Sequence, residues 1–147
     1  MPSTIRLHRV LRASADRVYR AFTEADALVK WLPPNGYTGI MHSFDAKVGG
    51  GYRMSFKSIA SGKGHSFEVK FQELVPANRI VHTDRFDDPN LPGEMTVEIT
   101  FAKVSAGTEL TIVQQGVPDV IPTDACYVGW QQSLTLLALL VEAEVGE

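Results

Sequence analysis

Cysteine is almost absent from this chain, which has only Cys126 among its 147 residues. One cysteine cannot form an internal disulfide, and it cannot supply the paired thiolates of a structural zinc site. The opening segment, Met1-Pro2-Ser3-Thr4, also lacks the basic, apolar and small-residue succession of a secretory signal. Together these absences predict a protein of the reducing cytoplasm.

Long hydrophobic runs and a strong charge of one sign are missing too. The longest apolar run, Leu136 to Val141, is far shorter than the roughly 18 residues that a membrane span requires. The net charge of -3 provides no excess of basic residues for a phosphate backbone. We therefore expect no membrane span and no nucleic-acid partner.

The common signatures of metal and nucleophile chemistry are also lacking. There is no His-x-x-x-His pair and no Gly-x-Ser-x-Gly elbow, so we predict no metal site, no cofactor and no catalytic nucleophile. Gly49-Gly50-Gly51 leads into a strand and not into a helix, which favours a bend or bulge over a phosphate loop. Cys126 falls on the apolar stripe of the last helix, where we interpret it as a small hydrophobe.

What the chain does have is the composition of one globular domain spanning residues 1–147, with 44% apolar and 21% charged residues. A first strand from Ile5 ends near Arg12, and Ser14 can cap a helix. A second short helix follows through Leu28 and Val29, and the prolines Pro33 and Pro34 end it.

From Tyr37 onward the apolar period changes to two for about eighty residues, which is typical of an antiparallel meander. Residues 79–86 form one of its strands, although their alternation leaves the inner face unassigned. Thr123 and Asp124 can cap a final helix that runs to about Glu144. The predicted fold class is α+β: a curved antiparallel sheet of about six to seven strands wrapped around a long C-terminal helix, with two short helices after the first strand.

One helix cannot cover a sheet of this width, so a cleft lined by hydrophobic side chains is expected between them. For each inward side chain taken singly, an ordinary close-packed core is the better interpretation, so the argument for a cleft rests on the set as a whole. Of the two tryptophans, we favour a core anchor for Trp130 and leave anchor or cavity rim open for Trp31. The candidate ligand-binding residues are Trp31, Tyr52, Met54, Phe56, Phe67, Val69, Met95, Val97, Ile99, Trp130 and Leu134.

Five motifs in order resemble the START-like (SRPBCC) helix-grip proteins, in the branch related to the C-terminal domain of activators of the heat-shock chaperone ATPase. They are residues 9–23, Lys30-Trp31-Leu32-Pro33-Pro34, Phe44-Asp45-Ala46-Lys47-Val48-Gly49-Gly50, residues 73–81, and Gly107-Thr108-Glu109-Leu110 with Gly129-Trp130. The resemblance implies a helix-grip fold that holds lipids, sterols, polyketide-like or other hydrophobic molecules between sheet and helix. Leu32 stands where this branch often has a second tryptophan, which would alter the cavity mouth.

Three functions fit these observations. We favour a non-catalytic binding protein whose partner is a small hydrophobic molecule. The first alternative is an enzyme of the cyclase or hydrolase type, with His65, His82, Asp84 or Arg85 as acid or base. The second is a co-chaperone with a chaperone partner, ranked last because the chaperone activators carry a further N-terminal domain for which this chain has no room. A homodimer is left open.

Overall fold

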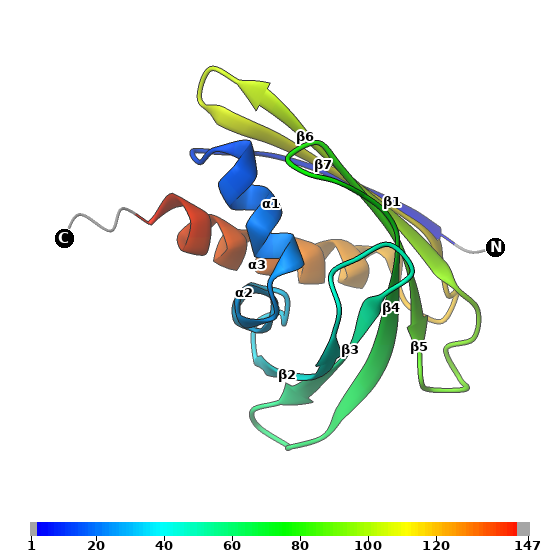
Figure 1. Ribbon diagram of the computed structural model, residues 1–147. Helices are drawn as coiled ribbons and strands as arrows, with labels where there is room; N and C mark the ends of the chain where they lie inside the picture. The colour runs from blue at the N-terminus through cyan, green and yellow to red at the C-terminus, as the bar shows by residue number, and fades with distance from the viewer. Residues whose placement is uncertain (1–2, 144–147) are drawn as a thin grey trace.

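The computed structural model describes residues 3–143 (Figure 1). Seven strands and three helices follow one another in the order β1 (Ser3–Leu11), α1 (Ala15–Thr23), α2 (Ala25–Trp31), β2 (Tyr37–Phe44), β3 (Gly51–Ser58), β4 (Gly64–Val75), β5 (Arg79–Phe86), β6 (Met95–Val104), β7 (Gly107–Val117) and α3 (Thr123–Glu142). The α+β class and the two short helices after the first strand are confirmed. None of these helices has the length and apolar character needed to cross a membrane.

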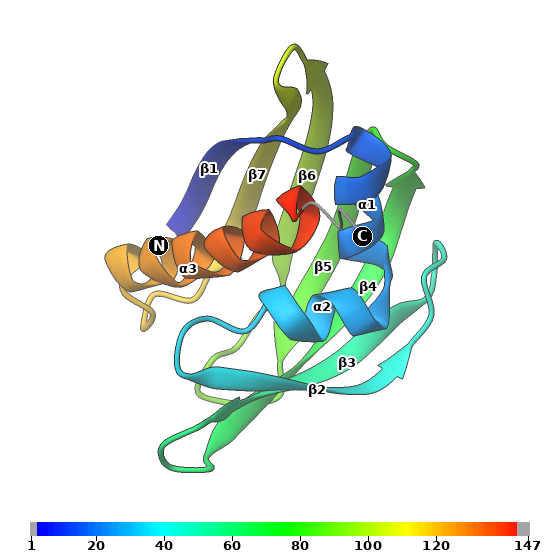
Figure 2. The same ribbon diagram turned by 90° about the vertical axis from the view of Figure 1, so that its left-hand side faces the viewer.

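All seven strands form one antiparallel sheet in the order β1-β7-β6-β5-β4-β3-β2. Consecutive strands from β2 to β7 pair as neighbours. The first strand, β1, pairs with β7 and forms one edge of the sheet, and β2 forms the other edge. The sheet curves, and α3 lies across its concave side with α1 and α2 beside it (Figures 1 and 2). This arrangement is the predicted helix grip.

Local sequence signals account for most of the element boundaries. Ser14 caps α1 by accepting a hydrogen bond from the backbone N–H of Arg17 at 3.2 Å, as predicted. The predicted side-chain cap of α3 is wrong: the helix begins at Thr123 after Pro122, and no side chain caps it. Pro122 stands at the N-cap position instead, with φ -60°. The helix ends at Glu142, and the expected end near Glu144 lies outside the described residues.

The three glycines Gly49, Gly50 and Gly51 form the connection from β2 into β3, and the register of β3 against β4 is regular beside them. The bend interpretation therefore holds and a bulge is absent at this point. Gly49 has φ +87°, which an L side chain rarely adopts, and a Cβ on Gly51 would collide with the carbonyl oxygen of Val69. The glycines allow the β2–β3 loop to press against β4.

A continuous apolar core fills the space between the sheet and the helices. On β5, Ile80 and His82 are buried while Arg85 is exposed, so the even-numbered residues of the previously unassigned strand face inward. On α3 the predicted stripe is buried at Leu134, Leu137 and Val141. The largest fully buried side chains are Trp31, Ile5, Leu11, Leu28, Met54, Ile80, Ile99, Leu110, Ile112, Leu137, Val18 and Val69.

Candidate functional site

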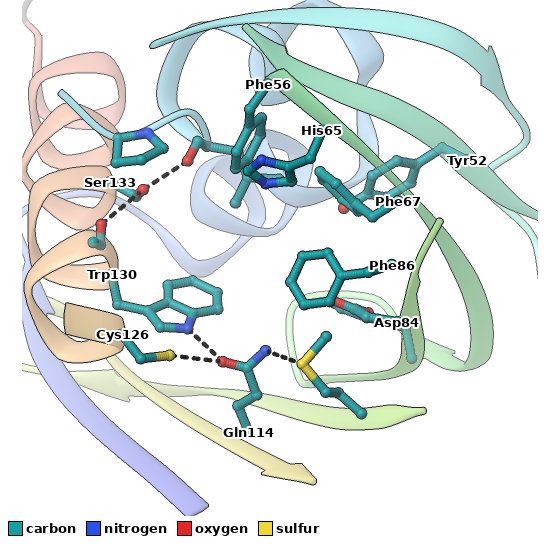
Figure 3. Close-up of a pocket in the computed structure, with 15 residues that line it drawn as sticks. Tyr52, Phe56, His65, Phe67, Asp84, Phe86, Gln114, Cys126, Trp130 and Ser133 are labelled. Carbon is teal, nitrogen blue, oxygen red and sulfur yellow. Dashed lines mark hydrogen bonds and ion pairs between the residues drawn. The ribbon is translucent and has the colours of Figure 1, made fainter. Parts of the chain in front are cut away.

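A cavity of about 200 Å³ lies between the N-terminal part of α3 and the inner face of β3 to β7 (Figure 3). Its walls are mainly apolar and aromatic, with a few polar groups among them. The lining residues are Leu32, Pro34, Tyr52, Phe56, His65, Phe67, His82, Asp84, Phe86, Met95, Gln114, Cys126, Gly129, Trp130 and Ser133.

The cavity exists because α3 does not follow the whole sheet. Within residues 3–143 its backbone comes close to β1, α1 and α2, and to none of the central strands. Side chains must bridge the remaining gap, and Gly129, which faces it, has none. A Cβ built on Gly129 would meet no atom within 4 Å. The space is therefore left open by a missing side chain as well as by the curvature of the sheet.

The sheet side of the cavity is a set of aromatic rings packed edge to face. Phe67 contacts Phe56 at a centroid distance of 5.1 Å and Tyr52 at 6.4 Å, in both cases T-shaped. His65 packs in the same way against Phe56 at 5.6 Å and against Phe86 at 5.7 Å. Because such contacts favour fixed ring orientations, this wall is largely pre-formed.

Gln114 of β7 joins the sheet to α3 at the opposite side of the cavity. Its Oε1 accepts hydrogen bonds from Trp130 Nε1 at 2.8 Å and from Cys126 Sγ at 3.7 Å, and its Nε2 donates to Met95 Sδ at 3.3 Å (Figure 3). Burial raises the pKa of the Cys126 thiol. The thiol is thus a neutral donor here and not an activated nucleophile.

A second polar group lies on β5, where His82 and Asp84 are two residues apart and share the inner face. His82 Nδ1 and Asp84 Oδ1 are 2.5 Å apart, and their side chains are only 10% and 15% exposed. Nearby, burial raises the pKa of Tyr52 well above its usual value, and the negative charge of Asp84 raises it further. The Tyr52 hydroxyl therefore keeps its proton.

His65 lies at the rim of the cavity and is exposed along one side. Partial burial lowers the pKa of its imidazole, and the charge of Asp88 opposes this effect. The neutral imidazole is favoured, which suits a ring that packs between two phenyl groups.

The loop between α2 and β2 covers one end of the cavity and is tied to α3 by two hydrogen bonds. Ser133 Oγ donates to the carbonyl of Leu32 at 2.6 Å, and the backbone N–H of Asn35 donates to Gln132 Oε1 at 3.1 Å. Pro34 and Gly129 line both the cavity and a shallower hollow on the surface. These two residues therefore mark the mouth.

The structure separates the sequence-predicted ligand-binding residues into two groups. Five line the cavity: Tyr52, Phe56, Phe67, Met95 and Trp130. The other six lie in the core away from it: Trp31, Met54, Val69, Val97, Ile99 and Leu134.

The two tryptophans show the difference most clearly. Trp31 is fully buried, donates its Nε1–H to the carbonyl of Ala21 at 2.8 Å and packs against Phe22, so it is an anchor of the α1–α2 pair. Trp130 is an anchor through Gln114 and also a wall of the cavity.

Several lining residues were not among the predicted ligand-binding set. His65, His82 and Asp84 appeared only as acid–base candidates, whereas Arg85, named with them, faces outward and pairs with Glu94 at 3.4 Å. Phe86 was missed because the inner face of residues 79–86 was not assigned. Other lining residues that were overlooked are Leu32, Pro34, Gln114, Gly129 and Ser133.

The sequence pattern could have predicted a buried polar contact at Gln114. This residue continues the inward alternation of Leu110 and Ile112, and a polar residue at such a position needs an internal partner. No cluster of three or more His, Cys, Asp or Glu side chains able to hold a metal ion occurs within the described chain.

Comparisons with known proteins agree with this architecture. Protein CV1439 from Chromobacterium violaceum is 56% identical, with a TM-score of 0.95 over 98% of this chain and 100% of that one. A Rhodobacter sphaeroides protein, 19% identical, gives a TM-score of 0.83 over 95% of this chain and 93% of its own. A Nitrosomonas europaea protein, 22% identical, gives 0.79 over 95% and 94%. The last two likenesses show the fold alone.

No curated protein matches the chain. Residues 12–142, by contrast, match the family described as "Activator of Hsp90 ATPase homolog 1-like protein". The match spans every element from α1 to α3. The chain therefore belongs to the family of Activator of Hsp90 ATPase homolog 1-like proteins, within the SRPBCC superfamily.

Proposed function

We propose that this protein binds a small hydrophobic molecule in the cavity between α3 and the sheet. The observation that carries the proposal is the cavity of about 200 Å³ with its wall of Phe56, Phe67, Phe86 and Trp130. Removing apolar ligand surface from water into such a space is favourable, and rings already held in place lose little entropy on binding.

Gly129 offers a direct test, because it lines the cavity and a Cβ placed on it would meet no atom within 4 Å. Gly129→Leu should fill the cavity and abolish ligand uptake. The fold should survive, since replacing glycine inside a helix stabilises it by roughly 0.5–1 kcal/mol. Gln131→Leu adds the same side chain on the exposed face of α3 and is the matched control.

The measurement is isothermal titration calorimetry with naphthalene, supported by native mass spectrometry of the freshly purified protein. The wild type and Gln131→Leu should bind, and Gly129→Leu should not. Equal binding by all three proteins would place the ligand elsewhere, and no binding by any of them would remove the proposed function.

An enzyme acting on the same ligand is the second candidate, and the His82–Asp84 pair is the observation that favours it. A carboxylate that holds one imidazole nitrogen can orient the ring for proton transfer. Hydrolysis of a panel of small aryl esters would support this function if His82→Gln removed the activity while His42→Gln, at an exposed histidine outside the cavity, left it unchanged. If the wild type hydrolyses none of the esters, ligand binding remains as the one proposed function.

A further inference from the structure

Apart from the ring nitrogens of His65 at the rim, three side-chain polar atoms of the cavity make no hydrogen bond within residues 3–143: Tyr52 Oη, His82 Nε2 and Asp84 Oδ2. Tyr52 is 5% exposed and His82 8%. Every sealed side-chain nitrogen or oxygen of the described residues has a hydrogen-bond partner, so these three atoms are open to a molecule inside the cavity. Water that reaches these atoms can hydrogen-bond to them, and a ligand that displaces this water loses affinity unless it makes the same hydrogen bonds.

The three residues that carry these atoms lie near one another on the inner face of the sheet. Strand register aligns Tyr52 with Val69, and Val69 with Asp84, in one row across β3, β4 and β5. His82 is two residues further along β5 on the same face. Phe67 and Phe86 stand beside this row, and Trp130 of α3 faces it across the cavity (Figure 3). The cavity thus has a polar end, formed by Tyr52, His82 and Asp84, and an aromatic remainder.

The polar end offers a charged hydrogen-bond acceptor, the free oxygen of Asp84. Asp84 uses one oxygen for His82 and leaves the other as an acceptor. His82 Nδ1 donates to Asp84, and the other ring nitrogen, Nε2, is left without a partner in the protein. The Tyr52 hydroxyl can donate or accept. A ligand that donates one hydrogen bond therefore fits, whereas a carboxylate would meet the negative charge of Asp84.

The volume sets the size of the hydrophobic part. A cavity of about 150 Å³ holds one benzene molecule, and drug-sized ligands occupy pockets of about 300–1,000 Å³. The present cavity, at about 200 Å³, falls between these values. One or two fused rings fit this space, and a sterol or a diacyl lipid does not.

From these observations we propose that the ligand is a compact, uncharged aromatic alcohol of one or two fused rings, whose hydroxyl donates to Asp84 and accepts from Tyr52. This inference rests on the proposed binding function and narrows it to a ligand class. The rings of the ligand lie between Phe67, Phe86 and Trp130. The hydroxyl occupies the polar end and pairs with Asp84 Oδ2 and Tyr52 Oη, two of the three atoms that the protein leaves unpaired.

Three ligands with the same ring system test the class by isothermal titration calorimetry: 2-naphthol, its methyl ether 2-methoxynaphthalene, and naphthalene. A hydrogen bond to a charged group predicts that 2-naphthol binds about tenfold more tightly than either of the others. Equal affinities of 2-naphthol and naphthalene would overturn the aromatic-alcohol proposal and leave hydrophobic binding intact. If none of the three binds, the proposed function itself fails.

Variants of the polar end provide the second test. Asp84→Asn and Tyr52→Phe should each lower the affinity for 2-naphthol about tenfold and leave that for naphthalene unchanged. Arg85→Gln, on the outer face of the same strand, is the matched control and should change neither. Circular dichroism reports whether each variant folds, and Tyr52→Phe, which keeps the ring, decides the matter if Asp84→Asn does not fold. Unchanged affinity of Tyr52→Phe and Asp84→Asn for 2-naphthol would overturn the assignment.

Two further ligands separate this class from its competitors. Palmitate tests an anionic acyl chain, and 1-naphthylmethylammonium tests a cation that Asp84 and the aromatic rings could hold. Both should bind more weakly than 2-naphthol. Tighter binding of either one would overturn the proposed class while confirming that the cavity takes ligands, provided that Gly129→Leu abolishes the binding.

Discussion

Trp130 donates its indole N–H to Gln114 Oε1 across 2.8 Å, and this bond joins the last helix to the seventh strand at the wall of the cavity. The same oxygen accepts from Cys126, and the amide nitrogen is bound to Met95. A single buried side chain therefore joins three elements of the site: β6, β7 and α3, the last through two successive turns.

Replacing Gln114 should lower the free energy of unfolding even when the new side chain has the same length. Gln114→Met keeps the length of the side chain but removes the acceptor of Trp130, and an unsatisfied buried donor costs about 1–3 kcal/mol. The free energy of unfolding in urea measures this loss. Gln115→Met, at the exposed neighbouring position, should change it by less than about 0.5 kcal/mol. Equal effects of the two substitutions would show that the Gln114 bonds do not stabilise the fold.

The two tryptophans should separate stability from binding. Trp31→Phe removes the bond to Ala21 and some buried ring volume, so we expect a loss of about 2 kcal/mol or more in the free energy of unfolding. Ligand affinity should stay unchanged because Trp31 does not line the cavity. Trp130→Phe should change ligand affinity as well as stability. Titration of both variants with one aromatic ligand, alongside urea unfolding, provides the comparison.

Ser133 should control how firmly the loop at the mouth is held. Ser133→Ala removes the hydrogen bond to Leu32, which should cost about 1 kcal/mol and speed amide hydrogen exchange in residues 32–36. Thr135→Ala is the control, since its hydroxyl bonds within α3 and to Arg9 and makes no contact with the loop. Unchanged exchange in the loop of Ser133→Ala would mean that other contacts hold it closed.

Tyr52 should make the protein less stable in alkali. Its pKa is raised in the folded state, so above about pH 10 the unfolded chain loses the phenol proton while the folded protein keeps it. The folded state then binds more protons, and the free energy of unfolding falls as the pH rises. Urea unfolding at pH 8 and above about pH 10 should show this decline.

Two variants assign the alkaline effect. Tyr52→Phe removes the titrating group and should reduce the decline, whereas Tyr37→Phe, at an exposed tyrosine, should leave it as in the wild type. A decline of the same size in Tyr52→Phe would assign the effect to other groups.

The fold could be predicted largely from period and capping because these signals are local. Ser14 at the start of α1 and the alternation of Tyr52, Met54 and Phe56 on β3 depend on a few neighbouring residues, and the structure agrees with them. The family resemblance pointed to the same helix grip. The unassigned face of residues 79–86 had a physical cause: Val81, His82 and Thr83 are all at least half-buried, so burial does not alternate cleanly there.

The cavity was harder to predict because it depends on where side chains are missing. Met54, Val69 and Ile99 share the inner face with Phe67 and Phe86, yet the first three are fully buried away from the cavity, whereas Phe67 and Phe86 line it. Sequence alternation reports which face is inward, and it carries no information about how far α3 stands from each strand. That distance is set by the tertiary packing of α1 and α2 against α3.

The pairing of β1 with β7 also affects the order in which the strands of the sheet can pair during folding. Ser3 lies opposite Val117, and Leu11 opposite Thr108, so β1 pairs with a strand from which the five other strands of the sheet separate it along the chain. Contacts so distant along the chain slow folding, since a long loop must close before they are gained. A chain that lacks residues 107–117 leaves β1 without its pairing partner, so β1 can join the sheet only after β7 is available.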